Sequence, residues 1–433
     1  MNNIVKKKKI AFICQFSNEE LRAHLSLSRR KFENFIRSLF GHQIKSYNDR
    51  VVWVSEYIKE FEKDNELEYH IVSLHPGMKR LTKSFTIRNV HYHVIRQEPF
   101  FVMNYLCNKF NIYKNNLYKR NRVLINKFIN EIDPDLVVVC GSENAYYALS
   151  VIDVHNKPIF SILQSLRNNP KLIKFENNEW NLIAEKIVLK HSNYFGGGGA
   201  LYYSLLKEMV PNPIFLKLGF PQGSPPIFND SIKKYDFIFY AARIGKNKGV
   251  EDVLKAFKIV HQNYPTIKLA IAGGSSDEYL SFLRNEYILP YGMNDNIIFC
   301  GFFQKFHDLY KEVQKSNYVI LPGISAGLNG TIRESMQMGL PVIAYETEST
   351  KLINAEKMRL LTAEMENYKD LADKMIFAIE NPDIMKDIAT SGKEYADIKY
   401  DSSIISKQLI SDFKYIMEHY YNQKDIPSSN LIS

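Results

Sequence analysis

The chain has 433 residues, of which 45% are hydrophobic, and a formal net charge of +9 at pH 7. This length predicts two or three domains, each with enough residues for its own core. No apolar run approaches the ~18 residues that cross a bilayer, and the start lacks the apolar core of a signal peptide, so we expect a cytoplasmic protein. The four cysteines show no close-spaced pairing, so we expect them to be free thiols.

The positive charge leaves several classes of anionic partner to consider. Basic residues are spread along the chain, apart from four consecutive lysines at residues 6–9. No basic motif with interleaved aromatic residues is present, so we expect no nucleic-acid partner. A lysine run is usually a solvated end, but each basic residue near anionic lipid adds about 1 kcal/mol of binding. A peripheral contact with the inner face of an anionic membrane therefore stays open.

The N-terminal part begins with a buried strand expected at residues 10–14. A segment of mixed polarity at 19–48 reads as an insertion, and the apolar spacing of residues 51–61 predicts a helix. A strand is expected at 69–74. The basic, aromatic stretch at 100–122 is either core, at odds of roughly three to one, or a surface that faces lipid or glycan.

Two further strands end in polar turns. The first is expected at 136–140 and is followed by Gly141, Ser142, Glu143 and Asn144, which open a helix. The second, at 158–163, ends at Gln164. Glutamine can donate and accept hydrogen bonds but cannot shuttle a proton, so we expect no essential imidazole chemistry there.

Four consecutive glycines occupy residues 196–199, between a short strand and a helix that starts near Ala200. The run is either a flexible loop or a backbone that directs helix N–H groups, around Gly198, at a ligand, and the sequence favours neither. The Pro- and Gly-rich residues 211–226 then predict a hinge between two domains.

Arg243 and Lys248 lie five residues apart in a turn expected after the strand at 237–241 and before a helix at 250–261. Taken alone, a basic turn is most often solvated. Across such a turn both cations can converge on one diphosphate, the arginine as a bidentate fork and the lysine as a point charge. That arrangement favours departure of a diphosphate without a metal ion, and we find no His, Cys and Asp cluster with metal-ligand spacing anywhere in the chain.

Strands and helices alternate over the following residues, as in doubly wound α/β domains. The expected elements are strands at 267–272, 297–300 and 318–321 and helices at 279–287 and 306–313.

The segment Ser325–Glu346 predicts a Gly-bearing loop, a helix that starts near Thr331 with Glu334 in its first turn, and a strand at 342–345. A helix N-terminus presents unpaired N–H groups and the positive end of the dipole to an anion. The usual role of such a glutamate is to complement the dipole, but it also suits a neutral polyol such as ribose. Together these features indicate a sugar nucleotide.

These motifs resemble the signature of family-4-type retaining glycosyltransferases. Glu334 matches the second glutamate of the family pattern, and Ser335, Met336 and residues 339–343 follow in register, whereas Ala326 stands where the first glutamate is expected. Residues 243–249 resemble the family's Arg-x-x-x-x-Lys-Gly turn.

The resemblance implies the GT-B fold, with two Rossmann-like doubly wound domains that face each other across a cleft. The domains are expected at 1–220 and 227–395, with 396–433 crossing back to the first through a helix near 402–419. Arg243, Lys248 and Glu334 are the expected catalytic residues. The expected substrate-binding residues are Phe302, Ala326, Gly327, Leu328, Asn329, Gly330 and Thr331 for the donor and Gln164, Arg167, Glu143 and Gly198 on the acceptor side.

The implied activity is transfer of a hexose from a nucleotide-diphosphate sugar to a hydroxyl of a glycan or lipid-linked acceptor. The resemblance also implies retention at the anomeric carbon and a role in surface polysaccharide synthesis. It further implies that the reaction needs no cofactor and no metal. Two alternatives stay open: a GT-B sugar-nucleotide 2-epimerase, which needs acid and base residues but no acceptor, and a catalytically degenerate nucleotide-binding subunit, for which Ala326 is the evidence.

Overall fold

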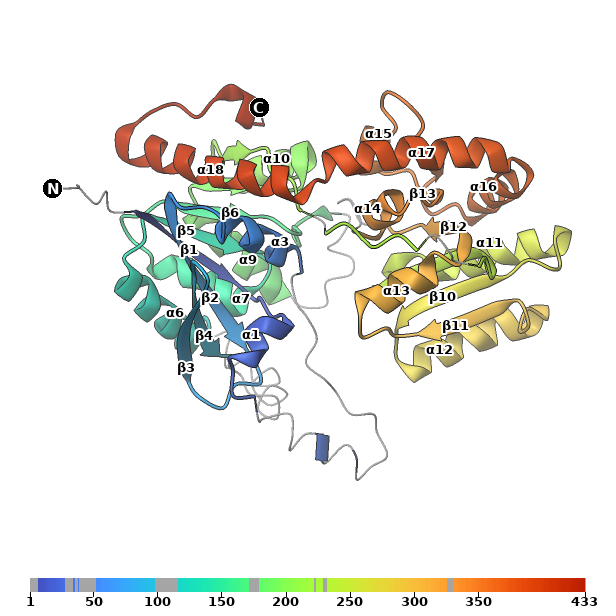
Figure 1. Cartoon of the computed structure of the whole chain (residues 1–433), viewed down its shortest axis with the longest axis horizontal. Helices are drawn as coiled ribbons and strands as arrows, with labels where there is room; N and C mark the ends of the chain where they lie inside the picture. The colour runs from blue at the N-terminus through green and yellow to red at the C-terminus, as the bar shows by residue number, and fades with distance from the viewer. Residues whose placement is uncertain are drawn as a thin grey trace. The chain divides into compact units, whose positions relative to one another are not determined.

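The computed structural model describes residues 7–27, 34–35, 38, 52–97, 116–170, 179–221, 223–228, 232–324 and 330–432. The chain forms two α/β units (Figure 1): unit 1 comprises Met1–Pro221 with Ser402–Ser433, and unit 2 comprises Gln222–Asp401. The sequence expectation assigned residues from 396 onward to the first domain. In the structure, residues 396–399 complete helix α17 (Pro382–Lys399) of unit 2.

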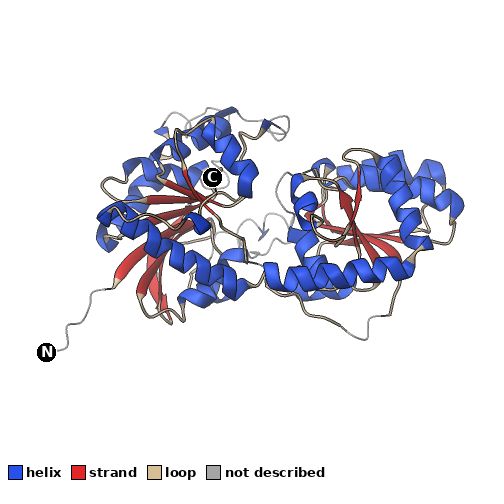
Figure 2. Cartoon of the chain, turned by 90° about the horizontal axis from the view of Figure 1, so that it is seen from above, coloured by secondary structure: helices blue, strands red, loops and turns tan. Residues whose placement is uncertain are grey.

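Unit 1 contains an eight-stranded sheet in the order β3-β4-β2-β1-β5-β6-β7-β8. Its strands are β1 (Lys8–Cys14), β2 (Leu67–His75), β3 (Thr82–Ile87), β4 (Val90–Arg96), β5 (Leu136–Cys140), β6 (Ile159–Ile162), β7 (Tyr194–Gly196) and β8 (Ile214–Leu216). Neighbours pair in parallel except for the antiparallel β3–β4 hairpin, which the sequence did not predict. Because helices lie on both sides of the sheet (Figure 2), the central strand β5 is apolar and buried at every residue.

Helices of unit 1 include one inside the segment that the sequence presents as an insertion. There, α1 (Glu19–Ala23) begins after Asn18, whose side chain accepts a 2.8 Å hydrogen bond from the Leu21 N–H and so caps the helix. The other helical segments are α3 (Val52–Phe61), α6 (Lys119–Ile132), α7 (Ala145–Ala148), η1 (Leu149–Asp153), α9 (Glu179–His191), α10 (Gly199–Lys207), α18 (Ser402–Asn422) and η5 (Ser428–Asn430).

Helix α18 returns to unit 1 and closes one of its cores. Phe413 is fully buried, with its ring centroid 6.1 Å from that of Phe61 in α3 and 6.4 Å from that of Phe160 in β6. Beyond the helix, the Lys217 N–H donates to the carbonyl of Asn430 at 2.7 Å, so the chain end is tied to the sheet edge at β8. The described residues beyond α18, up to Ile432, are thus part of the fold of unit 1.

Unit 2 contains a six-stranded parallel sheet in the order β11-β10-β9-β12-β13-β14. Its strands are β9 (Tyr235–Arg243), β10 (Leu269–Gly274), β11 (Ile297–Gly301), β12 (Ser316–Leu321), β13 (Val342–Tyr345) and β14 (Leu361–Ala363). The helical segments are η2 (Lys246–Lys248), α11 (Val250–Asn263), α12 (Asp277–Leu283), η3 (Arg284–Ile288), η4 (Leu289–Tyr291), α13 (Phe306–Val313), α14 (Gly330–Gln337), α15 (Glu348–Ile353), α16 (Tyr368–Glu380) and α17.

Helical periodicity explains how these helices bury one face. In α11 the buried apolar positions include Val250, Val253, Leu254, Phe257 and Val260, which recur at spacings of three and four and lie on one side of the helix. These residues pack in the same core as strands β9 and β10. The doubly wound arrangement predicted for this part of the chain is therefore confirmed.

None of the described helices is long and apolar enough to span a membrane. Cys14 and Cys140 are buried free thiols, as the sequence predicted, and Cys300 is a partly exposed one. Cys107 lies outside the described residues.

Candidate functional site

The predicted cations Arg243 and Lys248 lie at the carboxyl edge of the unit 2 sheet. Arg243 is the last residue of β9 and is exposed, and Lys248 ends the short helical turn η2 and is half-buried. Burial lowers the pKa of Lys248. Neither side chain has a hydrogen bond or ion pair with any described residue. Both cations are thus held at the end of a strand with their charges available to an anion.

Gly249 brings this basic turn against the segment that follows β12. Its backbone has φ +79°, and its N–H donates to the carbonyl of Lys246 at 3.0 Å. A Cβ added at Gly249 would lie 2.3 Å from the carbonyl oxygen of Pro322. The basic turn therefore lies against the residues that directly follow β12, at a close approach that only glycine allows.

Phe302 lies at the same edge of the sheet. It follows β11 and is 52% exposed. A Cβ added at Gly274, the last residue of β10, would lie 3.4 Å from the Phe302 ring, and Gly274 pairs in register with Arg243. An exposed aromatic face therefore lies next to the strand end that carries Arg243. This placement suits stacking of a flat ring such as a nucleobase.

Glu334 differs from its predicted position. Helix α14 begins at Gly330 and has no acidic residue in its first turn, so Glu334 lies in the second turn, and the expected first-turn placement is wrong. The reason is that the helix starts one residue earlier than expected. The side chain is also more enclosed than a dipole partner needs to be, since Glu334 is only 9% exposed.

Two tyrosines that the sequence did not single out surround Glu334. The Tyr240 hydroxyl lies 3.5 Å from Glu334 Oε2, 2.9 Å from Ser335 Oγ and 2.8 Å from the carbonyl oxygen of Thr331. Tyr310 lies against the same carboxylate, and burial together with this negative charge raises the pKa of Tyr310. The contacts orient Glu334 and tie the start of α14 to β9, the strand that ends in Arg243.

The remaining donor-side predictions fall at the start of α14. Gly330 and Thr331 are its first two residues, and Thr331 Oγ1 is buried without a hydrogen-bond partner among the described residues. Ala326, Gly327, Leu328 and Asn329 lie outside the described residues.

In unit 1 the structure brings Glu143 and Arg167 together at the carboxyl edge of the sheet. The Arg167 Nε–H donates to the backbone carbonyl of Glu143 at 3.1 Å. Burial raises the pKa of Glu143 to about 7, the nearby carboxylate of Glu185 adds to this effect, and Arg167 opposes it. A carboxyl group with this pKa can exchange a proton near neutral pH.

Glu185 of α9 was not predicted as a site residue, but it holds the loop that carries Arg167 in place. It is fully buried, and its carboxylate accepts hydrogen bonds from the backbone N–H groups of Arg167 at 3.1 Å and Asn168 at 2.9 Å. The polar loop after β6 is therefore fixed by a helix that follows it in the sequence. An isolated glutamate among apolar helix positions is too weak a pattern to predict this role.

Gln164 and Gly198 lie near the same edge of unit 1. Gln164 follows β6 and is exposed. Gly198 has φ +71° and precedes α10, and a Cβ there would lie 2.0 Å from the ring of Tyr202. The glycine is therefore required by the local packing, which neither excludes nor establishes a ligand at the helix start.

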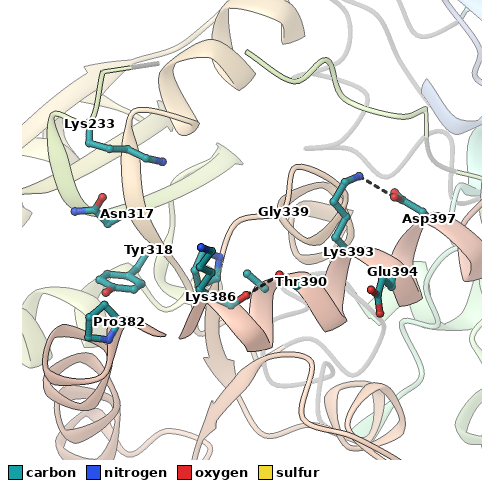
Figure 3. Close-up of a pocket in the computed structure, with 12 residues that line it drawn as sticks. Lys233, Asn317, Tyr318, Gly339, Pro382, Lys386, Thr390, Lys393, Glu394 and Asp397 are labelled. Atoms are coloured by element: carbon teal, nitrogen blue, oxygen red, sulfur yellow. Dashed lines mark hydrogen bonds and ion pairs between the residues drawn. The ribbon is translucent and has the colours of Figure 1, made fainter. Parts of the chain in front are cut away.

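A cavity of about 790 Å³ lies at the opposite, amino edge of the unit 2 sheet (Figure 3). It lies between the residue Lys233 before β9, the start of β12, the turn before β13 and one face of α17. Its lining residues are Lys233, Asn317, Tyr318, Gly339, Pro341, Pro382, Lys386, Ala389, Thr390, Lys393, Glu394 and Asp397. None of the predicted site residues is among them, so this cavity is distinct from the candidate site.

The sequence shows no cluster with metal-ligand spacing, but the folded chain brings together three side chains that could hold a metal ion. Glu68, His70 and His91 each place one ligand atom within 4.8 Å of the others. The pattern escapes a sequence search because the residues alternate on two strands, β2 and β4, that become neighbours only in the folded sheet.

Comparison with known proteins identifies relatives of both parts of the chain. Residues 227–395 match the family model described as glycosyl transferases group 1. Two uncharacterized glycosyltransferases of Methanocaldococcus jannaschii are similar: one is 25% identical over 52% of this chain and 58% of its own length, and the other is 23% identical over 76% and 85%. The capsular polysaccharide biosynthesis glycosyltransferase CapM of Staphylococcus aureus is 23% identical over 40% of this chain and 44% of its own.

Solved structures share the fold at low identity. Sucrose-phosphate synthase of Thermosynechococcus elongatus superposes with a TM-score of 0.67 at 13% identity, over 94% of this chain and 98% of that chain. HepE of Anabaena, solved in complex with UDP and glucose, gives a TM-score of 0.61 at 13% identity, over 94% and 99%.

Proposed function

Because residues 227–395 belong to the glycosyl transferases group 1 and the chain has the GT-B fold, we propose that this glycosyltransferase moves a sugar from a nucleotide-diphosphate donor to a hydroxyl group. The observation that carries the proposal is the pair of cations, Arg243 and Lys248, which lie at the carboxyl edge of the family domain without partners among the described residues.

In this proposal Arg243 and Lys248 bind the donor diphosphate. As the bond to the sugar breaks, negative charge grows on the leaving diphosphate, and fixed cations stabilise it without reorganisation. The N–H groups at the start of α14 add positive potential. We therefore expect transfer to need no metal ion and no cofactor. The turn that presents both cations is fixed by the contact between Gly249 and Pro322.

In this proposal, other residues of unit 2 bind the base and the ribose of the donor. Phe302 is placed to stack on the base, and Glu334, oriented by Tyr240 and Tyr310, is placed to accept hydrogen bonds from ribose hydroxyls. Gly330 and Thr331 belong to the same helix start, and Ala326 to Asn329 complete the proposed donor set on sequence grounds. Glu334 then needs its ionised form, since a carboxylate is the stronger acceptor.

We propose that unit 1 binds the acceptor through Glu143, Gln164, Arg167 and Gly198. The relation to CapM, whose name places it in capsular polysaccharide biosynthesis, supports a glycan or lipid-linked acceptor in surface polysaccharide synthesis. Retention at the anomeric carbon and transfer of a hexose follow the family pattern. A leaving diphosphate oxygen would accept the acceptor's proton, which agrees with a glutamine at position 164.

Calorimetric titration of nucleoside diphosphates in excess chelator tests the donor site, with UDP as the first probe because HepE binds it. Arg243→Ala and Lys248→Ala each remove charge-assisted hydrogen bonds worth about 1.5–3 kcal/mol, so we expect at least roughly tenfold weaker binding in each variant. Folding should persist because neither side chain holds a described residue in place.

Lys246→Ala provides the matched control. Lys246 lies in the same turn, is exposed and also lacks a side-chain partner among the described residues, but it is not part of the family motif. We expect Lys246→Ala to bind UDP with the same affinity as the wild type. Unchanged affinity in both motif variants, or binding that appears only with added magnesium or manganese, would contradict the proposal.

The epimerase alternative has one observation in its favour, the carboxyl of Glu143 with a pKa of about 7. Such a group suits the acid and base steps of epimerisation. NMR of a nucleotide sugar recovered after incubation without acceptor distinguishes the two functions. A transferase leaves the donor configuration unchanged, whereas an epimerase returns a mixture of the two epimers.

A further inference from the structure

Four ionisable side chains gather on one face of the unit 1 sheet, apart from the acceptor residues proposed for that unit. Glu68 and His70 alternate on β2, and His91 and His93 alternate on β4, which pairs with β2 in parallel (Figure 1). His70 and His91 are direct partners in the register, and their rings stack with centroids 4.8 Å apart. These residues lie in the amino-terminal part of β2, whereas Glu143 follows the carboxyl end of β5.

Outer hydrogen bonds fix the orientation of the imidazoles. The Nδ1 atom of His91 lies 2.9 Å from Thr86 Oγ1, which leaves its Nε2 atom to face the cluster. His93 joins Ser84 Oγ at 3.0 Å through Nδ1 and His70 Nδ1 at 3.1 Å through Nε2. Both hydroxyls come from β3, the neighbour of β4. Outer partners of this kind orient histidine ligands in metal sites.

A proton or a metal ion must lie between His70 and Glu68. His70 Nε2 lies 2.8 Å from Glu68 Oε1. A lone pair on this nitrogen would face a carboxylate oxygen, so either a proton or a metal ion has to lie between them. Lys9 gives only a distant counter-charge, with Nζ 3.9 Å from Glu68 Oε1. The Glu68 side chain is 31% exposed, so an ion can reach it from solvent.

We propose that Glu68, His70 and His91 bind a divalent transition-metal ion, zinc being the best match, and that the ion ties β2 to β4. Two imidazole nitrogens and one carboxylate oxygen form a common zinc ligand set, which leaves a fourth tetrahedral position for water. Zinc bonds of about 2.0–2.1 Å require ligand atoms roughly 3.3 Å apart. The three ligand atoms already lie within 4.8 Å of one another, so small side-chain rotations complete the site.

The hydrogen bonds that already orient His91 and His93 support this assignment, because a metal ion would find the imidazoles held in place. Because the cluster belongs to unit 1 and the proposed donor-binding residues belong to unit 2, loss of the ion should leave nucleoside diphosphate binding intact. The zinc proposal and the transferase proposal can therefore fail separately.

The test uses the full chain without a histidine tag, stripped with chelator and dialysed. Calorimetry with zinc chloride should show one site, and cobalt(II) should give visible absorption bands of a tetrahedral complex. Zinc should also raise the melting temperature, because an ion that binds the folded state stabilises it. In His91→Ala we expect zinc affinity to fall at least about 100-fold, beyond the roughly 10- to 100-fold that loss of an outer partner costs.

Glu68→Gln separates a metal site from a hydrogen-bond network. Its amide oxygen can still accept the His70 N–H, so the melting temperature in chelator should match the wild type, while the zinc-induced rise should disappear. His307→Ala, which removes an exposed histidine of unit 2 that lies beside Asp308, is the control and should bind zinc as the wild type does. A wild type that binds no more zinc than Glu68→Gln would overturn the proposal and show that a proton closes the cluster.

Discussion

Gly249 and Gly292 have similar left-handed backbones in unit 2 but different surroundings. Their φ angles are +79° and +66°, yet a Cβ would meet the Pro322 carbonyl at Gly249 and nothing within 4 Å at Gly292. Gly249→Ala should therefore strain the backbone by about 1–2 kcal/mol and also push the β12–α14 segment away from the basic turn. We expect lower thermal stability and weaker UDP binding, measured by scanning calorimetry and titration.

Gly292→Ala should strain the backbone in the same way, but its Cβ would displace no neighbouring residue. We expect it to lower the melting temperature modestly and to leave UDP affinity unchanged. If both variants lose affinity equally, or if Gly249→Ala binds UDP as the wild type does, the contact between Gly249 and Pro322 does not shape the donor site.

For single residues of the site, the sequence predicts which side chains carry charge but not which residues surround them. The spacing of Arg243, Lys248 and Gly249 is local, so the turn could be predicted from composition and order alone. Tyr240 lies 94 residues before Glu334, and its hydroxyl reaches that carboxylate only because β9 and α14 pack together. For the same reason the cluster of Glu68, His70 and His91 depends on a strand pairing that the sequence did not predict.

Helix α18 contains a buried carboxyl group, Asp412, that makes the stability of unit 1 depend on pH. Oδ1 accepts hydrogen bonds from Gln408 Nε2 at 2.9 Å and Asn430 Nδ2 at 3.0 Å, whereas Oδ2 is buried without a partner among the described residues. Burial raises the pKa of Asp412 to about 6 from its ordinary value of 3.8, and the two hydrogen bonds oppose this shift. The folded state therefore holds the proton more tightly than the unfolded state.

The sign of the effect follows from this difference. The contribution of Asp412 to stability is fully present below about pH 4 and is lost as the pH rises through about 6, a fall on the order of 2–3 kcal/mol. Asp412→Asn keeps an acceptor for Gln408 and Asn430 but cannot titrate. We expect to see this effect in urea unfolding from pH 4 to 7. As the pH rises, the free energy of unfolding of the wild type should fall relative to that of Asp412→Asn. A difference that stays constant with pH would contradict the assignment.

Element positions were easier to predict than their contacts. The apolar spacing of residues 306–313 predicted α13 with its observed bounds, because one periodic face and flanking polar residues suffice for a short amphipathic helix. The β3–β4 hairpin was missed because β3 is half-exposed and begins with polar residues. In β4, His91 and His93 alternate with buried hydrophobic residues, a period-2 signal that could have found this strand. The start of α14 was missed by one residue, which moves Glu334 into the second turn, because helix starts are set by capping and loop geometry that the sequence specifies weakly.

The division of the chain into two units predicts that a core mutation in one unit spares ligand binding by the other. Phe413 is supplied by the returning helix α18 and packs on Phe61 and Phe160 of unit 1. Phe413→Ala removes a fully buried ring, a change that typically costs about 3–5 kcal/mol. We expect the unit 1 transition in a calorimetric scan to move to lower temperature, while UDP affinity and the UDP-stabilised transition of unit 2 stay unchanged.

Tyr415→Ala on the same helix supplies the comparison, because Tyr415 is 37% exposed and its loss should shift the unit 1 transition much less. The physical reason for the separation is that all the proposed donor-binding residues belong to Gln222–Asp401, whereas α18 completes the core of the other unit. Hydrogen exchange in Phe413→Ala should therefore increase in β1, α3 and β6 and remain at wild-type levels in β9 and α11. Loss of protection in both units, together with weaker UDP binding, would show that the two units unfold as one cooperative body and that the returning helix stabilises the donor site as well.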